Sequence, residues 1–324
     1  MHFEPYPFEK LNTLLKDVTP NSNYEPSVLT IGEPQFETPD FIQEALKQNA
    51  HTLNKYPKSS GEASVMQAQR DFVKRRFGVE LKSDELLSTF GTREVLFNFP
   101  QFLLHDKIEP IMAYTNPFYQ IYEGAALASR AKVVHLNLTK ENNFKPDLHL
   151  SALHTADLVI LNFPNNPTTS TLSLEELGEW VKLALKYDFV LMNDECYSEI
   201  YADTPPPSLL EASLHVGNER FKNVLVINSI SKRSSAPGLR SGFIAGDANI
   251  LRPYLQYRTY VGAGIPLPLQ MASVLAWSDD AHVEKAREEY VANLALAEQI
   301  LGVKTSGATF YVWLEVGDGE AFAK

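Results

Sequence analysis

Short apolar runs of strand length alternate along this chain with segments of helical period. The strand-like runs lie near residues 157–162, 189–193, 224–228 and 242–246, and they consist mostly of Val, Ile, Leu, Met and Phe. Helical segments and polar loops separate several of these runs. Strands that alternate with helices predict an α/β fold, with a mostly parallel sheet flanked by helices on both faces.

Four segments have the apolar period of an amphipathic helix: residues 62–77, 95–104, 174–186 and 281–301. Gly78 and Gly302 follow the first and the last of these segments, where glycine commonly ends a helix. Ser173 and Glu176 have the spacing of a capping box, in which each side chain accepts a hydrogen bond from the backbone N–H of the other. The third helix is therefore predicted to begin directly after Ser173.

The C-terminal part of the chain has a different pattern. Two prolines within residues 265–268 interrupt the alternation, and residues 309–314 have the composition of a strand. We therefore predict a large domain over residues 36–262. A second, smaller α/β lobe is predicted from residues 1–35 together with residues 263–324.

Composition limits the class of protein. With 324 residues, of which 44% are hydrophobic and 21% charged, the chain can bury a large core. A formal net charge of −11 argues against a nucleic-acid partner or an anionic membrane surface. No apolar run approaches a membrane span, and residues 1–7 lack the pattern of a secretory signal. The single cysteine, Cys196, excludes an internal disulfide, so we expect a cytoplasmic protein, and no metal site is predicted.

The loop after residues 224–228 carries three side chains with distinctive chemistry. Ser229, Lys232 and Arg240 lie in a glycine-containing stretch at the expected C-terminal end of a strand. An amine can condense with an aldehyde, and a hydroxyl and a guanidinium can bind a phosphate monoester. The stretch therefore fits a cofactor that is both an aldehyde and a phosphate ester. A basic, solvated surface turn is the alternative interpretation.

Asp194 follows the run at residues 189–193. A carboxylate at the end of a central strand is costly to bury unless it faces a cation. A protonated pyridine nitrogen would be such a cation, and the ring would then act as an electron sink. Tyr197 lies three residues later and could reach a hydroxyl on the same ring. A buried helix cap and a core tyrosine are the alternative roles for these two residues.

Two further segments lie where a ligand is expected. Asn166 is in a turn after residues 157–162, at the edge of the sheet where α/β proteins bind ligands. Thr92 and Arg93 follow Gly91 at a helix start, where free backbone N–H groups can bind an anion. An ordinary Asn-Pro turn and helix capping by Thr92 explain the same residues without a ligand.

Together these segments resemble the fold-type I, pyridoxal-phosphate-dependent aminotransferases of class I/II, the aspartate aminotransferase-like group. The resemblance runs from about Ile31 to the end of the chain. Its most specific marker is Ser-x-Ser-Lys with an arginine eight residues beyond the lysine. It implies pyridoxal 5'-phosphate as cofactor, Lys232 as the catalytic lysine that binds it covalently, and Asp194 as the partner of its ring nitrogen. Tyr197, assigned to catalysis, and Asn166 are implied to contact the ring oxygen.

The same resemblance assigns the remaining contacts. Four residues are implied to bind the phosphate: Thr92, Arg93, Ser229 and Arg240. Tyr119 matches the aromatic residue that stacks on the cofactor ring, although a core aromatic is the alternative. Gly32 matches the residue whose backbone meets the substrate α-carboxylate, with Asn166 also assigned to the substrate. Tyr56 matches a tyrosine that a neighbouring subunit lends to the phosphate, which implies a homodimer with shared active sites. A simple turn residue is the alternative for Tyr56.

The chain departs from the family in two places. The family usually has a C-terminal arginine that pairs with the substrate carboxylate, whereas this sequence ends at Lys324 before such a residue. Either the gene product continues past Lys324, or the chain is truncated there. If it is truncated, cofactor binding should survive while substrate binding falls, because the lost bidentate pair is worth several kcal/mol. Thr169 also stands where the family often has glycine.

Within the family, residues 193–201, 205–212 and 231–243 are similar to bacterial N-succinyldiaminopimelate aminotransferases. This resemblance implies lysine and diaminopimelate biosynthesis, with glutamate as amino donor and N-succinyl-2-amino-6-oxopimelate as acceptor. Lys232 would then be the general base in a ping-pong exchange between an amino acid and a 2-oxo acid. Aspartate or another dicarboxylic amino acid is the alternative substrate. A β-lyase and a cofactor-binding but non-enzymatic domain are the alternative functions.

Overall fold

The protein forms a sheet flanked by helices. The computed structural model describes residues 3–25, 27, 29–262 and 264–324. Within them a seven-stranded sheet has the order β1-β7-β6-β5-β4-β2-β3. The strands are β1 (Leu86–Thr89), β2 (Ile111–Asn116), β3 (Lys132–Asn137), β4 (Leu158–Leu161), β5 (Val190–Asp194), β6 (Val224–Ser229) and β7 (Gly242–Gly246). Neighbours from β6 to β3 run parallel, whereas β7 is antiparallel to both β6 and β1. The predicted α/β fold with a mostly parallel sheet is confirmed.

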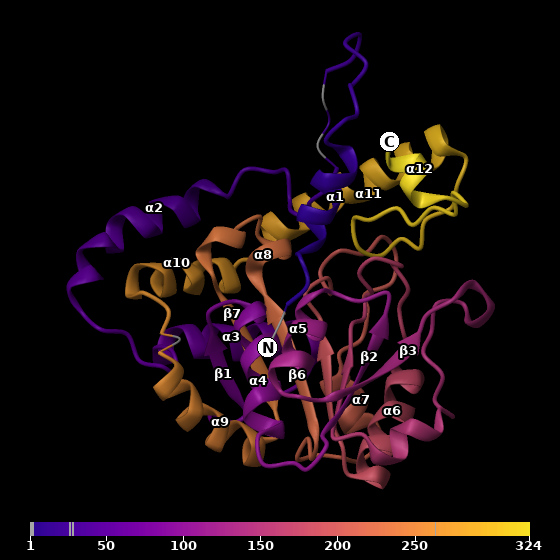
Figure 1. Ribbon diagram of the computed structural model, residues 1–324. Helices are drawn as coiled ribbons and strands as arrows, with labels where there is room; N and C mark the ends of the chain where they lie inside the picture. Colours follow the sequence, from indigo (N-terminus) through magenta and orange to yellow (C-terminus); the bar gives the residue numbers. More distant parts are fainter. Residues whose placement is uncertain (1–2, 26, 28, 263) are drawn as a thin grey trace.

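Helices cover both faces of this sheet (Figure 1). One core contains residues of α3, α6, α7 and α10, and the core on the other face contains residues of α4, α5 and α9. The helices are α1 (Pro7–Leu15), α2 (Asp40–Asn49), α3 (Ala63–Phe77), α4 (Thr92–Leu104), α5 (Ile121–Ala128), α6 (Leu174–Tyr187), α7 (Leu209–His215), α8 (Ile230–Arg233), α9 (Ala248–Val261), α10 (Leu267–Ser278), α11 (Ala281–Leu301) and α12 (Gly319–Ala323). Short 3-10 turns are η1 (Ala50–Asn54), η2 (Lys140–Asn142), η3 (Ser151–Thr155) and η4 (Pro237–Leu239).

The predicted helix ends are confirmed. Gly78 and Gly302 end α3 and α11 with φ of 68° and 65°, a left-handed conformation that glycine adopts without a steric cost. At the start of α6, the backbone N–H of Glu176 donates to Ser173 Oγ at 3.3 Å, and the N–H of Ser173 donates to a Glu176 carboxylate oxygen at 2.8 Å. Helix α4 begins at Thr92, earlier than the apolar pattern indicated.

The expected strand over residues 309–314 is wrong. Thr309 has a φ of 62°, so the chain turns where a strand would continue. The only bridge recorded outside the named strands of the described residues joins Tyr201 with Ala308. The β-rich composition of this segment therefore reflects packing of its aromatic side chains, because Phe310 and Tyr311 pack against a small cluster around Tyr197.

The topology brings several loops to one edge of the sheet. Because β4, β5 and β6 are parallel, the residues that follow them meet at the same edge. Gly242 pairs with Thr89 on one side and with Ser229 on the other, so the loop from β1 into α4 opens at this edge too. The loops that carry the predicted site residues therefore converge.

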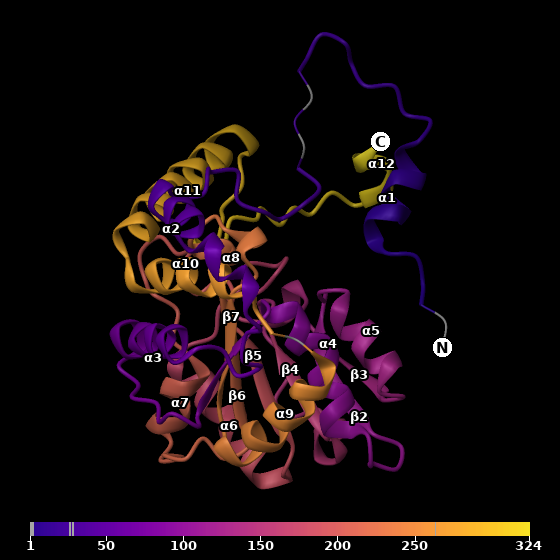
Figure 2. The same cartoon turned by 90° about the vertical axis from the view of Figure 1, so that its left-hand side faces the viewer.

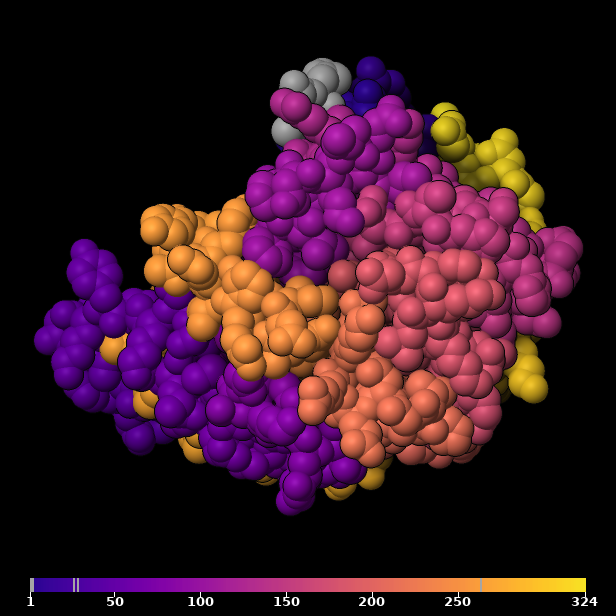
Figure 3. Space-filling model, turned by 90° about the horizontal axis from the view of Figure 1, so that it is seen from below, coloured from indigo at the N-terminus to yellow at the C-terminus, as the bar shows by residue number. Residues whose placement is uncertain are grey.

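The C-terminal residues lie above this edge. Helix α12 is close to α1 in both ribbon views, and α11 crosses over α10 and α8 (Figures 1 and 2). Seen from the opposite side, the C-terminal residues in yellow are visible only at the margin of the molecule (Figure 3). The division into residues 36–262 and residues 1–35 with 263–324 stays a prediction, and residue 263 lies outside the described residues. None of the helices that the structure describes has the length and apolar composition to cross a membrane.

Candidate active site

A pocket of about 1210 Å³ opens at the converging loops. Ten of the eleven predicted site residues line it: Gly32, Thr92, Arg93, Tyr119, Asn166, Asp194, Tyr197, Ser229, Lys232 and Arg240. The exception is Tyr56, which does not line the pocket and whose side chain is fully exposed. The structure thus brings together residues that are spread over more than 200 positions of the sequence.

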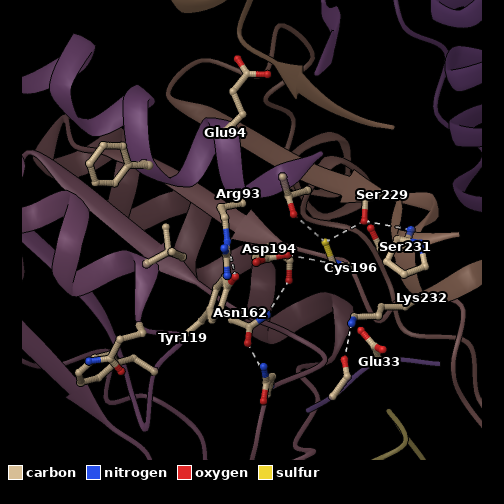
Figure 4. A pocket seen from close by; sticks show the side chains of 18 of the residues that line it. Glu33, Arg93, Glu94, Tyr119, Asn162, Asp194, Cys196, Ser229, Ser231 and Lys232 are labelled. Carbon is tan, nitrogen blue, oxygen red and sulfur yellow. Dashed lines mark hydrogen bonds between the residues drawn. The ribbon is translucent and has the colours of Figure 1, made fainter. Parts of the chain in front are cut away.

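Asp194 is a buried carboxylate at the C-terminal end of β5. Its Oδ2 accepts a hydrogen bond from Tyr122 Oη at 3.2 Å. Its Oδ1 accepts one from the backbone N–H of Cys196 at 3.2 Å (Figure 4). Asn162 Nδ2 donates to the Asp194 carbonyl at 3.0 Å, which fixes the backbone. Burial raises the pKa of Asp194, opposed by these hydrogen bonds and by the charge of Lys232. Such a carboxylate is suited to a cationic partner in the pocket.

Lys232 lies on the short helix α8, whose first turn is capped by the Ser229 side chain. Its Nζ donates a hydrogen bond to the Gly32 carbonyl. Burial lowers the pKa of Lys232, and the thiol of Cys196 and the carboxylate of Glu33 partly oppose this shift. In Figure 4 the amine lies beside Glu33, in the same cavity as Asp194. A lowered pKa increases the neutral fraction of the amine, which is the nucleophilic form.

The turn before α4 forms a cradle for an anion. Gly91 has a φ of 72°, and a Cβ at this position would lie 2.3 Å from Arg240 Nη2. Only glycine allows the guanidinium to come so close to the first turn of α4, which begins at Thr92 and has free backbone N–H groups. Burial and the nearby charge of Arg93 lower the pKa of Arg240. Among the described residues neither guanidinium has a carboxylate within ion-pair distance, so the cradle is suited to a dianion.

Arg93 has two tyrosine partners. Its Nε donates to Tyr119 Oη and its Nη2 donates to Tyr6 Oη, both at 3.0 Å. Burial raises the pKa of Tyr119 to about 12, although Arg93 acts in the opposite direction. These contacts orient the guanidinium within the pocket. Phosphate binding by Arg93 and ring stacking by Tyr119 stay predictions, as do the individual roles of the other pocket residues.

Four residues of the site were not found from the sequence: Tyr6, Asn162 and Tyr311, which line the pocket, and Tyr122, which donates a hydrogen bond to Asp194. Tyr122 lies 72 residues before its partner Asp194, so only the packing of α5 reveals the contact. Its one signal is the spacing Tyr119-x-x-Tyr122 across the start of α5, where the two ring centroids lie 6.0 Å apart. Asn162 directly follows β4 and could have been found by the same strand-end argument as Asn166.

The residues present fit pyridoxal phosphate. The buried carboxylate of Asp194 suits a protonated ring nitrogen, and the partly buried amine of Lys232 suits an aldehyde. The cradle formed by Gly91, Thr92 and Arg240 suits a phosphate monoester. Each of the three chemical groups thus has a complementary side chain in one cavity.

Comparison with known proteins identifies relatives that are aminotransferases. Residues 26–324 match the model of the aminotransferase class I and II family. The 4-dedimethylamino-4-oxo-anhydrotetracycline transaminase of Streptomyces rimosus is 32% identical over 284 residues, covering 88% of this chain and 74% of that protein. The LL-diaminopimelate aminotransferase of Aquifex aeolicus is 30% identical over 310 residues, covering 91% of this chain and 78% of that protein.

A solved structure has the same fold at higher identity. The crystal structure of the aminotransferase AspB from Helicobacter pylori superposes with a TM-score of 0.97 and is 60% identical. The match covers 99% of this chain and 86% of that one. An aminotransferase structure from Neisseria meningitidis has a TM-score of 0.93 at 39% identity, covering 98% of this chain and 84% of that one.

Proposed function

The chain belongs to the class I and II aminotransferases, and we propose that within this family it transfers amino groups between glutamate and a long dicarboxylic 2-oxo acid of the diaminopimelate type. It is a pyridoxal-phosphate-dependent transaminase that acts on small amino acids and 2-oxo acids. The substrate class is the proposal. The observation that carries it is the size of the pocket.

The pocket is larger than a typical ligand site. Its volume of about 1210 Å³ exceeds the roughly 300–1000 Å³ of most small-molecule pockets, so it has room for a long substrate in addition to the cofactor. Arg93 is more exposed than Arg240 and lies on the side of the pocket with Tyr6 and Tyr119. Because Arg93 is assigned to the cofactor phosphate, the volume of the pocket is what favours a long substrate.

Each catalytic step is assigned to a residue of the pocket. Bound pyridoxal phosphate supplies an aldehyde that takes up the amino group and a ring that accepts electrons from the Cα–H bond. We assign removal and return of the Cα proton to Lys232, whose lowered pKa favours the neutral base. Asp194 would hold the ring nitrogen protonated, and Tyr197 with Asn166 would hold the ring oxygen. Gly32 would present its backbone to the substrate carboxylate.

The phosphate would be held by four residues around the start of α4: Thr92, Arg93, Ser229 and Arg240. Thr92 Oγ1 lies 3.3 Å from Cys196 Sγ, and Ser229 Oγ lies 3.6 Å from the same sulfur, so the two hydroxyls flank one thiol. Hydroxyls in this arrangement can both donate to one phosphate group.

The identity of the substrate is open to a direct test. Local resemblance to N-succinyldiaminopimelate aminotransferases favours the succinylated compound, whereas the Aquifex relative is named for LL-diaminopimelate itself. The holoenzyme is mixed with 2-oxoglutarate and either N-succinyl-LL-diaminopimelate, LL-diaminopimelate or aspartate, and glutamate formation is followed. We expect the highest kcat/KM with the succinylated donor. A higher value for aspartate than for both diaminopimelates would contradict the proposed substrate class.

The attachment of the cofactor is tested separately. Borohydride reduction of the holoenzyme followed by peptide mapping should place a pyridoxyl label on Lys232. Lys232→Ala should lose turnover and the label but still bind the cofactor through its phosphate. Lys285→Ala removes an exposed lysine on α11 and should keep both properties. Labelling of a different lysine in the unmodified protein would contradict the assignment.

We also propose a homodimer with shared active sites. Tyr56 is fully exposed, and its neighbour Leu53 is 71% exposed. Pro57 lies against Gly264, just beyond α9, where Tyr260 is 87% exposed. In the view from below, the violet segment near residue 50 lies beside α9 in orange (Figure 3). Large apolar side chains that gather on one surface are typical of a subunit interface, and a second copy would cover them.

A further inference from the structure

Tyr311, in the C-terminal segment, extends into the pocket and contacts Tyr197. The two hydroxyl oxygens are 2.6 Å apart, and the ring centroids are 5.5 Å apart at an interplanar angle of 60°. Tyr197 is buried and Tyr311 is partly buried, and both line the pocket. None of the functions assigned above uses Tyr311.

The backbone around Tyr311 is held in place on the loop after β5. The Thr309 N–H donates to the Ile200 carbonyl at 2.9 Å, and the Ala202 N–H donates to the Gly307 carbonyl at 2.7 Å. The Tyr311 N–H then donates to Thr309 Oγ1 at 3.2 Å. These bonds fix where the tyrosine ring enters the pocket, so its hydroxyl is placed by a docked segment and not by a free loop.

The hydroxyl of Tyr311 also lies directly against Gly32. A Cβ on Gly32 would come within 2.0 Å of Tyr311 Oη, so any larger residue at this position would displace the tyrosine. The Gly32 carbonyl accepts from Lys232 Nζ, and the same Nζ lies 5.7 Å from the centre of the Phe310 ring. Phe310 therefore lies near the catalytic amine of Lys232, and Tyr311 lies against Gly32, the proposed carboxylate site.

Either tyrosine hydroxyl can donate in this pair, and proton counting gives the direction once Tyr197 donates into the pocket. A phenol has one proton to donate. Burial raises the pKa of both hydroxyls, so both keep their protons at neutral pH. Tyr197 can donate into the pocket only if it accepts from Tyr311, and a donor that is itself hydrogen-bonded in this way is strengthened.

We propose that Tyr311 is a positioning residue for the transamination: its hydroxyl donates to Tyr197 and thereby turns the Tyr197 proton toward the cofactor ring oxygen. This inference rests on the proposed function, in which Tyr197 contacts that oxygen. Tyr311 thus makes the C-terminal segment part of the catalytic apparatus. A hydrogen bond to an anionic ring oxygen favours its deprotonated form, so weakening that bond raises the pKa of the bound cofactor.

The test uses the holoenzyme of four variants: Tyr197→Phe, Tyr311→Phe, the double variant that combines them, and Tyr290→Phe. The last is a matched control, because Tyr290 belongs to the same aromatic cluster and its buried hydroxyl has no hydrogen-bond partner among the described residues. The absorbance of the bound cofactor is titrated against pH. Tyr311→Phe should raise the midpoint by about 0.3 to 1 pH unit, in the same direction as Tyr197→Phe. Tyr290→Phe should leave it unchanged.

The double variant separates the possible outcomes. If Tyr311 acts through Tyr197, adding Tyr311→Phe to Tyr197→Phe produces no further shift. A shift with Tyr197→Phe but none with Tyr311→Phe overturns this inference and leaves the proposed role of Tyr197 intact. No shift with Tyr197→Phe removes that role and the inference with it. An equal shift with Tyr290→Phe shows a general packing effect and also overturns the inference.

Discussion

Tyr122 Oη donates a hydrogen bond to Asp194 Oδ2 at 3.2 Å, and it does so from α5, the helix that lies between β2 and β3 along the chain. This contact fixes the position of the carboxylate. Burial raises the pKa of Asp194, so its ionised form needs a positive charge nearby to stabilise it. The chemistry of the pocket therefore depends on this one acid being ionised when the cofactor is bound.

Asp194→Ala should lower kcat by several orders of magnitude, since nothing else among the described pocket residues offers a carboxylate at the end of β5 to hold the ring nitrogen protonated. Tyr122→Phe keeps the carboxylate and removes one hydrogen bond, so its loss should be smaller, about ten-fold. Steady-state rates with saturating amino acid measure both effects. A near-normal kcat for Asp194→Ala would refute the role.

Glu195 predicts a pH dependence of stability. Its Oε1 accepts hydrogen bonds from the Leu209 N–H at 2.8 Å and from Ser208 Oγ at 3.1 Å, and burial raises its pKa from 4.5 to about 8. Between these values the folded protein keeps a proton that the unfolded chain has lost. The free energy of unfolding should therefore fall as pH rises through this window, by up to about 1.4 kcal/mol per unit.

Replacing Glu195 tests the sign of this dependence. Glu195→Gln cannot ionise, so its denaturant midpoint should decline less between pH 5 and pH 8 than that of the unmodified protein. Glu288→Gln changes an exposed residue of α11 and should keep the original slope. Parallel slopes for Glu195→Gln and the unmodified protein would count against a raised pKa.

Arg258 and Glu94 form a buried ion pair between α9 and α4. Arg258 Nε lies 2.6 Å from Glu94 Oε1, and the two side chains are 0% and 9% exposed. Arg258→Ala leaves the carboxylate buried and should lower the free energy of unfolding by about 3–5 kcal/mol. Arg252→Ala on the same helix breaks an exposed pair with Asp84 and should cost about 1 kcal/mol or less. Equal losses for the two variants, measured by denaturant unfolding, would contradict this account.

Tyr56 tests the shared active site. Tyr56→Phe removes only a hydroxyl from a fully exposed side chain, so the thermal midpoint of the cofactor-free protein should not change. If a second subunit uses this hydroxyl, the Kd for pyridoxal phosphate should rise about ten-fold. Tyr24→Phe, at a side chain that is 76% exposed, should have no effect on Kd. Full activity and unchanged affinity in a monomeric preparation would rule out the shared site.

Much of the pocket could be predicted because it depends on strand ends. Asn166, Asp194 and Ser229 each follow an apolar run, and parallel strands bring such residues to one edge whatever the details of packing. The direction of β7 could not be predicted, since an apolar run has the same composition in either orientation. The contacts of Tyr122 and Tyr311 were missed because they depend on where α5 and the C-terminal segment pack. No local sequence pattern predicts where these two segments pack.

The antiparallel pairing of β1 with β7 has a consequence for synthesis on the ribosome. Leu86 pairs with Ala245, so the first of the seven described strands to emerge waits for the last of them before it is paired. At the usual translation rates that delay is roughly 10 to 30 s. During this time the nascent chain exposes an unpaired apolar strand. We therefore expect the yield of folded protein in cells to depend strongly on chaperones that bind the nascent chain, even though the finished sheet is stable.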